Sequence, residues 1–230
     1  MNLYLLPMLL AGDSHSQALT PYSVEIMKQL KVLFVENVKT TRRFISSLKQ
    51  DIVIDELRFI EVNKDTSFEK IFEVLSDLQE DAGIISEAGC AGVADPGGLV
   101  VEAGHQLGFT VRPLVGPNSI LLALMGSGLN GQSFAFHGYL PIKEDERAAK
   151  LRALEKEAVQ RKQTQIFMET PYRNNAMLQT LLKTLGPQTR LCVAADLTAE
   201  TEYIFTRSIA GWKKHPLPDL HKRPAIFLFN

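Results

Sequence analysis

The sequence predicts an α/β protein of two lobes. Up to Leu140, short apolar runs of strand character alternate with amphipathic segments of helical spacing, which is typical of a parallel sheet covered by helices on both faces. A loop with four glycines, residues 86–98, joins one of these strands to a helix. After Pro141 the chain is shorter and richer in strands. We therefore expect an N-terminal lobe over 1–140 and a C-terminal lobe over 141–230.

The hydrophobic periodicity predicts the individual elements in chain order. In the first lobe we expect strands at 2–6, 31–36, 83–85 and 109–115, with helices at 20–30, 40–49, 66–80, 99–107 and 118–125. The charged stretch 143–163 predicts an exposed helix that links the lobes, with Leu151 and Leu154 as its apolar contacts. In the second lobe we expect strands at 164–168, 190–195, 202–207 and 224–229, and a helix at 173–185.

The glycine-rich loop 86–98 is the most informative segment. It follows a buried strand, and a crossover to the next parallel strand places it at the carboxyl edge of the sheet, where open α/β sheets bind ligands. Three interpretations stay open: a tight turn without a ligand, a dinucleotide phosphate site, and a site that holds a nucleoside-like cofactor through backbone contacts. The loop lacks Gly-x-Gly-x-x-Gly and the chain lacks Gly-x-x-x-x-Gly-Lys-Ser/Thr, which disfavours a phosphate-binding loop.

Five motifs occur in a fixed order along the chain, at residues 84–98, 113–119, 134–141, 167–173 and 194–198. In the same order they resemble the Asp-Ala-Gly-Thr-Pro-Gly-Ile-Ser-Asp-Pro-Gly loop, the Pro-Gly-Pro-Ser-Ala step, and the Phe-x-Gly-Phe-Leu-Pro, Tyr-Glu-Ser-Pro-His-Arg and Ala-Arg-Glu-Leu-Thr elements of the tetrapyrrole (corrin/porphyrin) methylase superfamily. The resemblance is greatest to the branch that methylates the ribose 2′-hydroxyl of small-subunit ribosomal RNA.

This resemblance implies a methyltransferase that uses S-adenosylmethionine, bound between a parallel-sheet N-terminal lobe and a mixed-sheet C-terminal lobe. The cofactor contacts that it implies on the first lobe are Ala88, Gly89, Val93, Asp95, Gly116 and Ser119. Those implied on the second lobe are Phe136, Gly138, Tyr139, Thr170, Pro171, Pro224 and Ala225. Because the methyl donor carries its own leaving group, the protein mainly has to align the acceptor and exclude water.

The sequence departs from the family pattern in two places. Residues 5–10 lack the glycine of the family's first turn, and Asn37 replaces the second carboxylate of its acidic segment. Two alternatives therefore stay open besides an RNA ribose methyltransferase. The same fold could methylate a tetrapyrrole or another small molecule, or the protein could bind the cofactor without catalysis.

A sugar hydroxyl is a poor nucleophile until its proton is removed or hydrogen bonded, so a base is required. Glu36 is the first candidate, because it ends a predicted strand at the ligand-binding edge and matches the family's acidic motif. The alternative is that Glu36 caps the following helix. Glu169 is the second candidate, and its alternative is an exposed ion pair with Arg173 across one helical turn.

The charge pattern limits how RNA could bind. The net charge is −1, so the chain has no global attraction for phosphate and binding must depend on local basic patches. Arg42 and Arg43 are the preferred phosphate contacts, because guanidinium groups can bind phosphate bidentately. A second basic group lies near the C-terminus, at residues 213–215 and 222–223.

Composition sets the remaining expectations. The 230 residues are 45% hydrophobic, enough for a sizeable buried core. The two cysteines, Cys90 and Cys192, make neither a disulfide framework nor a metal site, so we expect free thiols and no metal. The apolar run from Leu3 to Ala11 is too short to span a bilayer, and we expect a cytoplasmic protein with no membrane contact. The resemblance also implies a homodimer.

Overall fold

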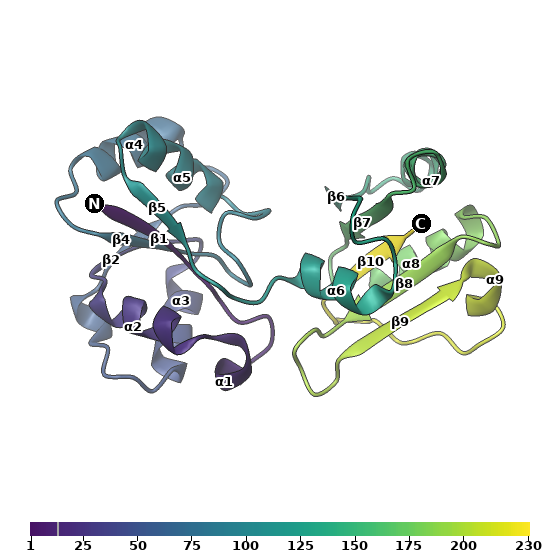
Figure 1. Cartoon of the computed structure of the whole chain (residues 1–230), viewed down its shortest axis with the longest axis horizontal. Helices are drawn as coiled ribbons and strands as arrows, with labels where there is room; N and C mark the ends of the chain where they lie inside the picture. Colours follow the sequence, from purple (N-terminus) through teal and green to yellow (C-terminus); the bar gives the residue numbers. More distant parts are fainter. Residues whose placement is uncertain (13) are drawn as a thin grey trace. The chain divides into compact units, whose positions relative to one another are not determined.

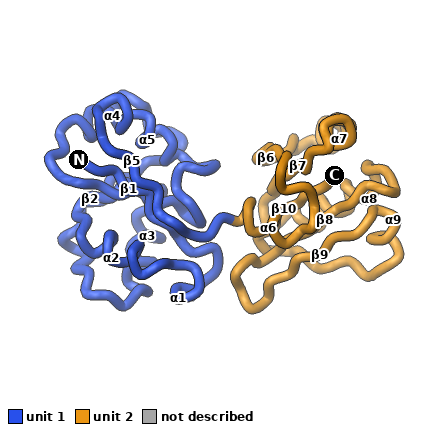
Figure 2. Tube along the Cα trace, viewed as in Figure 1, with its two compact units in different colours: residues 1–118 blue, residues 119–230 orange. Residues whose placement is uncertain are grey.

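The computed structural model describes residues 1–12 and 14–230. The chain forms two compact units, unit 1 over Met1–Asn118 and unit 2 over Ser119–Asn230 (Figure 2).

Unit 1 is built on a five-stranded sheet in the order β3-β2-β4-β1-β5. All of its strand pairs are parallel, as the alternation of strands and helices predicted. The strands are β1 (Asn2–Leu6), β2 (Val32–Val35), β3 (Arg58–Glu61), β4 (Ala82–Ile85) and β5 (Thr110–Pro113). Strands β2 and β4 are buried along their whole length and read as continuous apolar runs, because a parallel sheet with both faces covered offers them no solvent.

Helices cover both faces of this sheet (Figure 1). One face packs against α2 (Pro21–Gln29) and α3 (Val38–Ser47), and the other against α4 (Phe68–Ser76) and α5 (Gly97–Gln106). Side chains alternate along the strands. Leu33 therefore packs in the core beneath α2 and α3, and Phe34 packs in the core beneath α4 and α5. Two short helices, α1 (His15–Ala18) and the 3₁₀ turn η1 (Ile54–Glu56), complete the unit.

Unit 2 contains a mixed five-stranded sheet in the order β6-β7-β10-β8-β9. Only the β6–β7 pair is parallel. The strands are β6 (Phe134–Tyr139), β7 (Thr164–Met168), β8 (Arg190–Ala195), β9 (Tyr203–Ser208) and β10 (Ala225–Phe229). The helices are α6 (Ser119–Ser127), α7 (Glu144–Arg161), α8 (Asn174–Thr184) and α9 (Ile209–Trp212).

The boundary between the units differs from the predicted one after Leu140. Residues 119–140 belong to unit 2, because α6 packs on β8, β9 and β10 and β6 pairs with β7. The prediction of an exposed linking helix is also wrong. Leu151, Leu154 and Ala158 of α7 are buried in the core of unit 2, and α7 packs on α8. The apolar contacts predicted at Leu151 and Leu154 are confirmed, and the charged side chains of α7 occupy its outer face.

Candidate functional site

The carboxyl edge of the unit 1 sheet gathers three carboxylates from two strand ends. Glu36 follows β2, and its Oε2 accepts a hydrogen bond from the backbone N–H of Glu87 at 3.1 Å. Glu87 and Asp95 both lie in the loop that follows β4. Because β2 and β4 are neighbouring parallel strands, their ends meet at one edge, as predicted for a ligand site.

Glu36 has a perturbed acidity. Partial burial raises the pKa of Glu36 above the ordinary glutamate value, and the charges of Asp95 and Glu87 act in the same direction. The hydrogen bond from Glu87 opposes this shift, because it stabilises the charged form. A half-buried carboxylate with a raised pKa at a sheet edge is typical of groups that exchange protons with a ligand.

The glycine-rich loop is held by its own polar groups. Asp95 Oδ1 accepts hydrogen bonds from the backbone N–H groups of Gly92 (3.1 Å) and Gly97 (2.7 Å), so it closes the loop and satisfies a donor at the start of α5. Gly89 and Gly92 have positive φ angles of 71° and 82°, which only glycine adopts readily. The second Asp95 oxygen, Oδ2, is buried and has no hydrogen-bond partner among the described residues.

Close packing within unit 1 also requires glycine at positions 89 and 116. A Cβ atom on Gly116 would lie 2.0 Å from Cβ of Pro7, and one on Gly89 would lie 3.2 Å from the carbonyl oxygen of Pro117. The glycine-rich loop therefore packs on the main chain of the segment after β5, and that segment packs on the Pro7 ring in the loop after β1. This close approach explains both glycines without a ligand, and it leaves a rigid wall of main-chain atoms at the sheet edge.

An open groove of about 680 Å³ runs along this edge. It is lined by Leu99 of α5 and by residues of the loops after β2, β3 and β4: Glu36, Asn37, Asn63, Lys64, Glu87, Ala94, Asp95 and Pro96. Sequence reasoning missed Asn63 and Lys64, because it did not predict strand β3. Had the short run Arg58–Glu61 been recognised as a strand, the residues after it would have been placed at this edge.

Helix α3 is capped by Asn37 and not by Glu36, so the alternative role of Glu36 as a helix cap is wrong. The side-chain oxygen of Asn37 accepts a hydrogen bond from the backbone N–H of Thr40 at 3.1 Å and caps α3. The helix therefore begins with Asn37 as its cap, and the Glu36 carboxylate is turned to Glu87 instead. The replacement that looked like a lost acid is a good N-cap residue.

The two predicted phosphate contacts differ in their surroundings. Both Arg42 and Arg43 are exposed on α3. The Arg42 guanidinium lies 2.6 Å from Asp55 Oδ1 and 5.8 Å from the centre of the Phe59 ring, so part of its charge is already paired. Arg43 is not paired with a carboxylate in the described part of the chain.

In unit 2 the predicted cofactor residues also gather at one sheet edge. Tyr139 pairs with Met168 across β6 and β7, and Ile226 pairs with Met168 across β10 and β7. This register brings Gly138 and Tyr139, Glu169 to Pro171, and Pro224 with Ala225 to the same end of the sheet. The β6–β7 register shifts between Phe136 and Tyr139, where Gly138 has a φ of 62° and open space around it. Bulges of this kind are common beside binding sites.

Glu169 is buried rather than exposed. Its side chain is 1% exposed and its Oε1 accepts hydrogen bonds from Arg173 (2.6 Å) and from the backbone of Thr170 (2.7 Å). The predicted ion pair is present, but it lies in the turn before α8, and the prediction of a solvent-exposed contact is wrong. Glu169 Oε2 is buried without a hydrogen-bond partner among the described residues. Such an atom has unused capacity to accept a donor.

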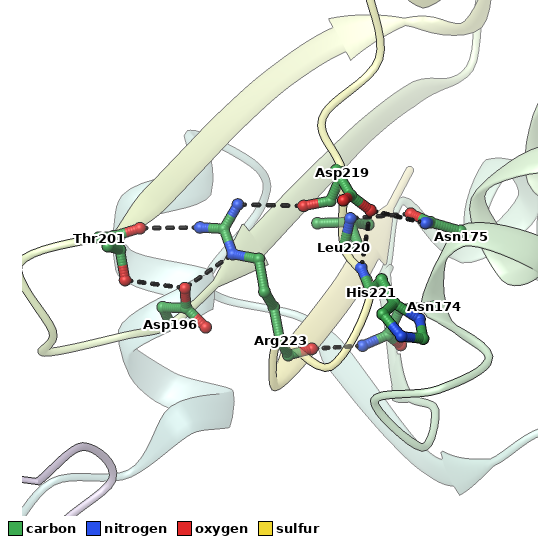
Figure 3. Close-up of polar contacts among 8 residues, drawn as sticks. All are labelled: Asn174, Asn175, Asp196, Thr201, Asp219, Leu220, His221 and Arg223. Carbon is green, nitrogen blue, oxygen red and sulfur yellow. Dashed lines mark hydrogen bonds and ion pairs between the residues drawn. The ribbon is translucent and has the colours of Figure 1, made fainter.

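Arg223 joins the loops at this edge (Figure 3). Its guanidinium donates to Asp196 Oδ2 at 2.7 Å and to the backbone oxygens of Thr201 at 2.8 Å and Asp219 at 3.3 Å. Its own carbonyl accepts from the buried Asn174 side chain at 2.6 Å. Arg223 directly precedes Pro224 and Ala225, so this network fixes the backbone of two predicted cofactor contacts. The sequence placed Arg223 in a surface basic group, and its position inside the network corrects that expectation.

Neighbouring contacts extend the network to the Glu169 turn. Asn175 donates to Asp219 and accepts from the backbone N–H of Leu220, each at 2.8 Å (Figure 3). The backbone N–H of Lys222 donates to the carbonyl of Pro171 at 3.1 Å. The segments 169–175, 196–201 and 219–224 are thereby held together at one end of unit 2.

Comparison with known proteins decides the family. The sequence profile described as "Tetrapyrrole (Corrin/Porphyrin) Methylases" matches residues 11–211, which is most of the chain. The chain belongs to the tetrapyrrole methylase family. The predicted family and its two-lobed α/β fold are confirmed, and so is the class of enzyme, a methyltransferase.

Several relatives of this tetrapyrrole methylase carry the name "Ribosomal RNA small subunit methyltransferase I". That of Bacillus subtilis is 29% identical over 91% of this chain and 69% of its own length. The proteins of Micromonospora olivasterospora and Xylella fastidiosa are 32% and 29% identical, over 87% and 91% of this chain and 61% and 74% of their own lengths. The chain thus spans about two thirds of the length of these relatives.

Solved structures with the same fold include other methyltransferases. The crystal structure of the methyltransferase CobJ matches with a TM-score of 0.62 at 12% identity, covering 100% of this chain and 93% of that one. Uroporphyrin-III-C-methyltransferase from Thermus thermophilus matches with a TM-score of 0.54 at 17% identity, over 100% of this chain and 91% of that one. At these identities the likeness concerns the fold alone.

Two further observations concern ions and membranes. Among the described residues no group of three or more His, Cys, Asp or Glu side chains is placed to hold a metal ion. Within the same part of the chain, no helix has the length and apolar content that a membrane crossing requires. Cys90 and Cys192 are free thiols, as predicted.

Proposed function

We propose that this protein transfers a methyl group from S-adenosylmethionine to a ribose 2′-hydroxyl of small-subunit ribosomal RNA. The observation that carries the proposal is the Glu36 carboxylate at the edge of the unit 1 sheet, beside the glycine-rich loop. A sugar hydroxyl requires a base, and Glu36 is a half-buried carboxylate of raised pKa in an open groove. The names of the relatives from Bacillus, Micromonospora and Xylella support ribosomal RNA as the acceptor.

The residues of each unit fit the cofactor. In unit 1, Ala88, Gly89 and Val93 present the main chain of a loop that Asp95 closes, and Asp95 Oδ2 is an unused buried acceptor. In unit 2, the open bulge at Gly138 and the buried Glu169 Oε2 offer space and a second unused acceptor. S-adenosylmethionine would supply an activated methyl group, and its amino groups are donors that these acceptors suit.

The two carboxylate oxygens of Glu36 suit the role of a base. Its Oε2 accepts a hydrogen bond from the Glu87 N–H, which would leave Oε1 for the acceptor hydroxyl. The proton of the hydroxyl would pass to Oε1 as the hydroxyl oxygen takes the methyl group, while the bond from that methyl carbon to the donor sulfur breaks and its electron pair leaves the sulfur uncharged. Glu169 is held by Arg173 and Thr170, so its part would be to position the turn 169–173 rather than to take the proton.

Of the remaining expectations on assembly and location, only the homodimer follows from the resemblance. We propose a homodimer located in the cytoplasm. The individual cofactor contacts, and the phosphate contacts of Arg42 and Arg43, are likewise proposals.

The decisive experiment incubates purified protein and S-adenosylmethionine labelled in the methyl group with protein-free small-subunit ribosomal RNA or with a small-molecule extract. We expect label in RNA at an internucleotide bond that resists alkaline hydrolysis, because a 2′-O-methyl group removes the hydroxyl that attacks the phosphate. Label in a small molecule alone would support the tetrapyrrole-type alternative. Calorimetry that detects no saturable cofactor binding at millimolar concentration would contradict the whole proposal.

A further inference from the structure

Strand β9 carries a stack of aromatic and cationic side chains at the edge of the unit 2 sheet. Because side chains alternate along a strand, Tyr203, Phe205 and Arg207 lie on one face. The Tyr203 and Phe205 rings stack with their centres 6.2 Å apart, and the Arg207 guanidinium carbon lies 4.3 Å from the centre of the Phe205 ring. Phe205 is 40% exposed, although it is a large aromatic residue.

Helix α9 fixes Arg207 from the other side. The guanidinium carbon of Arg207 lies 5.8 Å from the centre of the Trp212 ring, and Trp212 is buried and donates to the carbonyl of Leu191 at 2.9 Å. A Cβ atom on Gly211 would lie 3.4 Å from Cβ of Arg207, so the arginine stem runs across this glycine. Two rings and a glycine thus hold the guanidinium in place, which lowers the entropy lost when it binds a ligand.

Two exposed lysines follow the ring that holds Arg207. Lys213 and Lys214 follow Trp212 in a turn whose backbone N–H groups donate to Ile209 (3.2 Å) and Gly211 (3.1 Å), and both side chains are exposed. The segment 203–215 contains no Asp or Glu. In the part of the chain that the structure describes, no carboxylate forms an ion pair with Arg207, Lys213 or Lys214.

We propose that Arg207, Lys213 and Lys214, with the exposed Phe205 ring, form a surface on unit 2 that binds the phosphate backbone of the RNA acceptor. This inference depends on the proposed function and adds to it a second contact surface, apart from the groove of unit 1. A fixed guanidinium presents a planar fork that matches phosphate. Exposed rings beside cations are typical of surfaces that bind single-stranded RNA. The whole chain carries a net charge of −1 and does not attract phosphate globally. Attraction must therefore come from local groups of unpaired cations such as these three.

A second copy of this chain fits the surface less well. A two-fold symmetric interface places the same patch of both copies face to face. The three unpaired cations of each copy would then lie within one interface, with no carboxylate in segment 203–215 to offset them. Electrostatic complementarity therefore favours a polyanion.

The test measures the affinity for protein-free small-subunit ribosomal RNA as a function of salt. The variant Lys213→Gln/Lys214→Gln changes only exposed side chains, and Lys150→Gln/Lys156→Gln on the exposed side of α7 is the matched control. Each phosphate contact on a single strand contributes about 0.7 to the slope of log K against log salt. Loss of two contacts should make the slope shallower by about 1.4 and weaken binding about 15-fold at 0.15 M salt, with no difference near 1 M.

Substitutions of Arg207 separate the contribution of its charge to RNA binding from that of its planar shape. Arg207→Gln should lower the slope by about 0.7 more, whereas Arg207→Lys should keep the slope while losing the planar fork. Affinity for S-adenosylmethionine should be unchanged in every variant. Arg207 pairs with Leu191, whereas the predicted cofactor contact Ala225 pairs with Ala195, so Arg207 lies at the opposite end of the sheet.

Three results would overturn the inference. If the Lys213/Lys214 variant has the slope of the wild type while the wild type binds and methylates RNA, the surface does not contact RNA and the proposed function stands. If the variant changes the oligomeric state in sedimentation, the surface is an interface between copies. If the wild type neither binds nor methylates RNA, the proposed function fails and this surface fails with it.

Discussion

Replacing Glu36 with glutamine tests the base directly. The glutamine side-chain oxygen can still accept the hydrogen bond that Glu87 N–H donates to Glu36 Oε2 at 3.1 Å. The change therefore keeps the shape and the loop contact, and removes only the ability to take a proton.

The expected loss follows from the role of a general base. Such groups contribute about 100- to 10,000-fold to the rate, which is about 2.7 to 5.4 kcal/mol of transition-state stabilisation at about 1.36 kcal/mol per tenfold change. Methyl transfer at saturating cofactor should fall by this factor. The affinity for S-adenosylmethionine, measured by calorimetry, should stay close to that of the wild type.

Glu87→Gln is the matched control, because it removes a neighbouring carboxylate but keeps the backbone N–H that holds Glu36. The charge of Glu87 raises the pKa of Glu36, and only the ionised Glu36 can act as a base. The rate of the wild type should fall as the pH drops through this raised pKa. In Glu87→Gln the same fall should occur at lower pH, with the plateau rate at high pH largely kept.

Stability gives a second readout of the same group. The folded state binds the Glu36 proton more tightly than the unfolded chain, whose glutamate pKa is about 4.3. The contribution of Glu36 to stability therefore decreases as the pH rises from about 4.3 through the raised folded pKa. Glu36→Gln should raise the melting temperature at pH 7 and lose this advantage at pH 4. Full turnover by Glu36→Gln, or an unchanged melting temperature at both values, would refute the reasoning.

Three further predictions concern the surrounding structure. Gly89→Val should weaken cofactor binding at least tenfold in calorimetry, because valine at a φ of 71° is strained and its Cβ would lie 3.2 Å from the Pro117 carbonyl; unchanged affinity would show that the loop does not contact the cofactor. Asn37→Ala should lower the free energy of unfolding by about 1 kcal/mol in urea titrations through loss of the α3 cap, while Asn37→Ser should lose much less. Arg223→Gln should raise the KM for cofactor with a smaller effect on kcat, since it loosens the backbone before Pro224, and Asp196→Asn should act in the same direction; a change in kcat alone would contradict this positioning role.

The sequence predicted the sheet of unit 1 well where the strands are buried. Strands β1, β2 and β4 lie within two residues of their expected ranges, since a central parallel strand is a continuous apolar run. Strand β3 was missed because it is an edge strand whose sequence, Arg58 to Glu61, has charged ends. Strand β6 coincides with a family motif, but its local pattern does not predict a strand, because its glycine bulge interrupts the alternation.

The site could be predicted to the level of the sheet edge but not of the contact. Sequence spacing placed Glu36 and the loop 86–98 at the same edge, and the structure brings them within hydrogen-bond distance. The sequence alone could not show that Asn37 caps α3, that Glu169 is buried, or that Arg223 holds three loops together. These roles depend on contacts between residues far apart in the chain, such as Arg223 with Asp196 and Asn174, for which no local pattern exists.

The charges at the unit 1 edge argue that this groove is kept for chemistry. Glu36, Glu87 and Asp95 repel one another, and the raised pKa of Glu36 means that folding is weakened by its charge at neutral pH. A protein under pressure for stability alone would gain by replacing Glu36 with an uncharged residue. The next residue, Asn37, is uncharged and caps α3 without adding a fourth carboxylate. Glu36 thus has the two properties that the proposed base requires. It is a carboxylate near enough to others to hold its proton more tightly than usual, and one of its oxygens is free to take a proton from a hydroxyl.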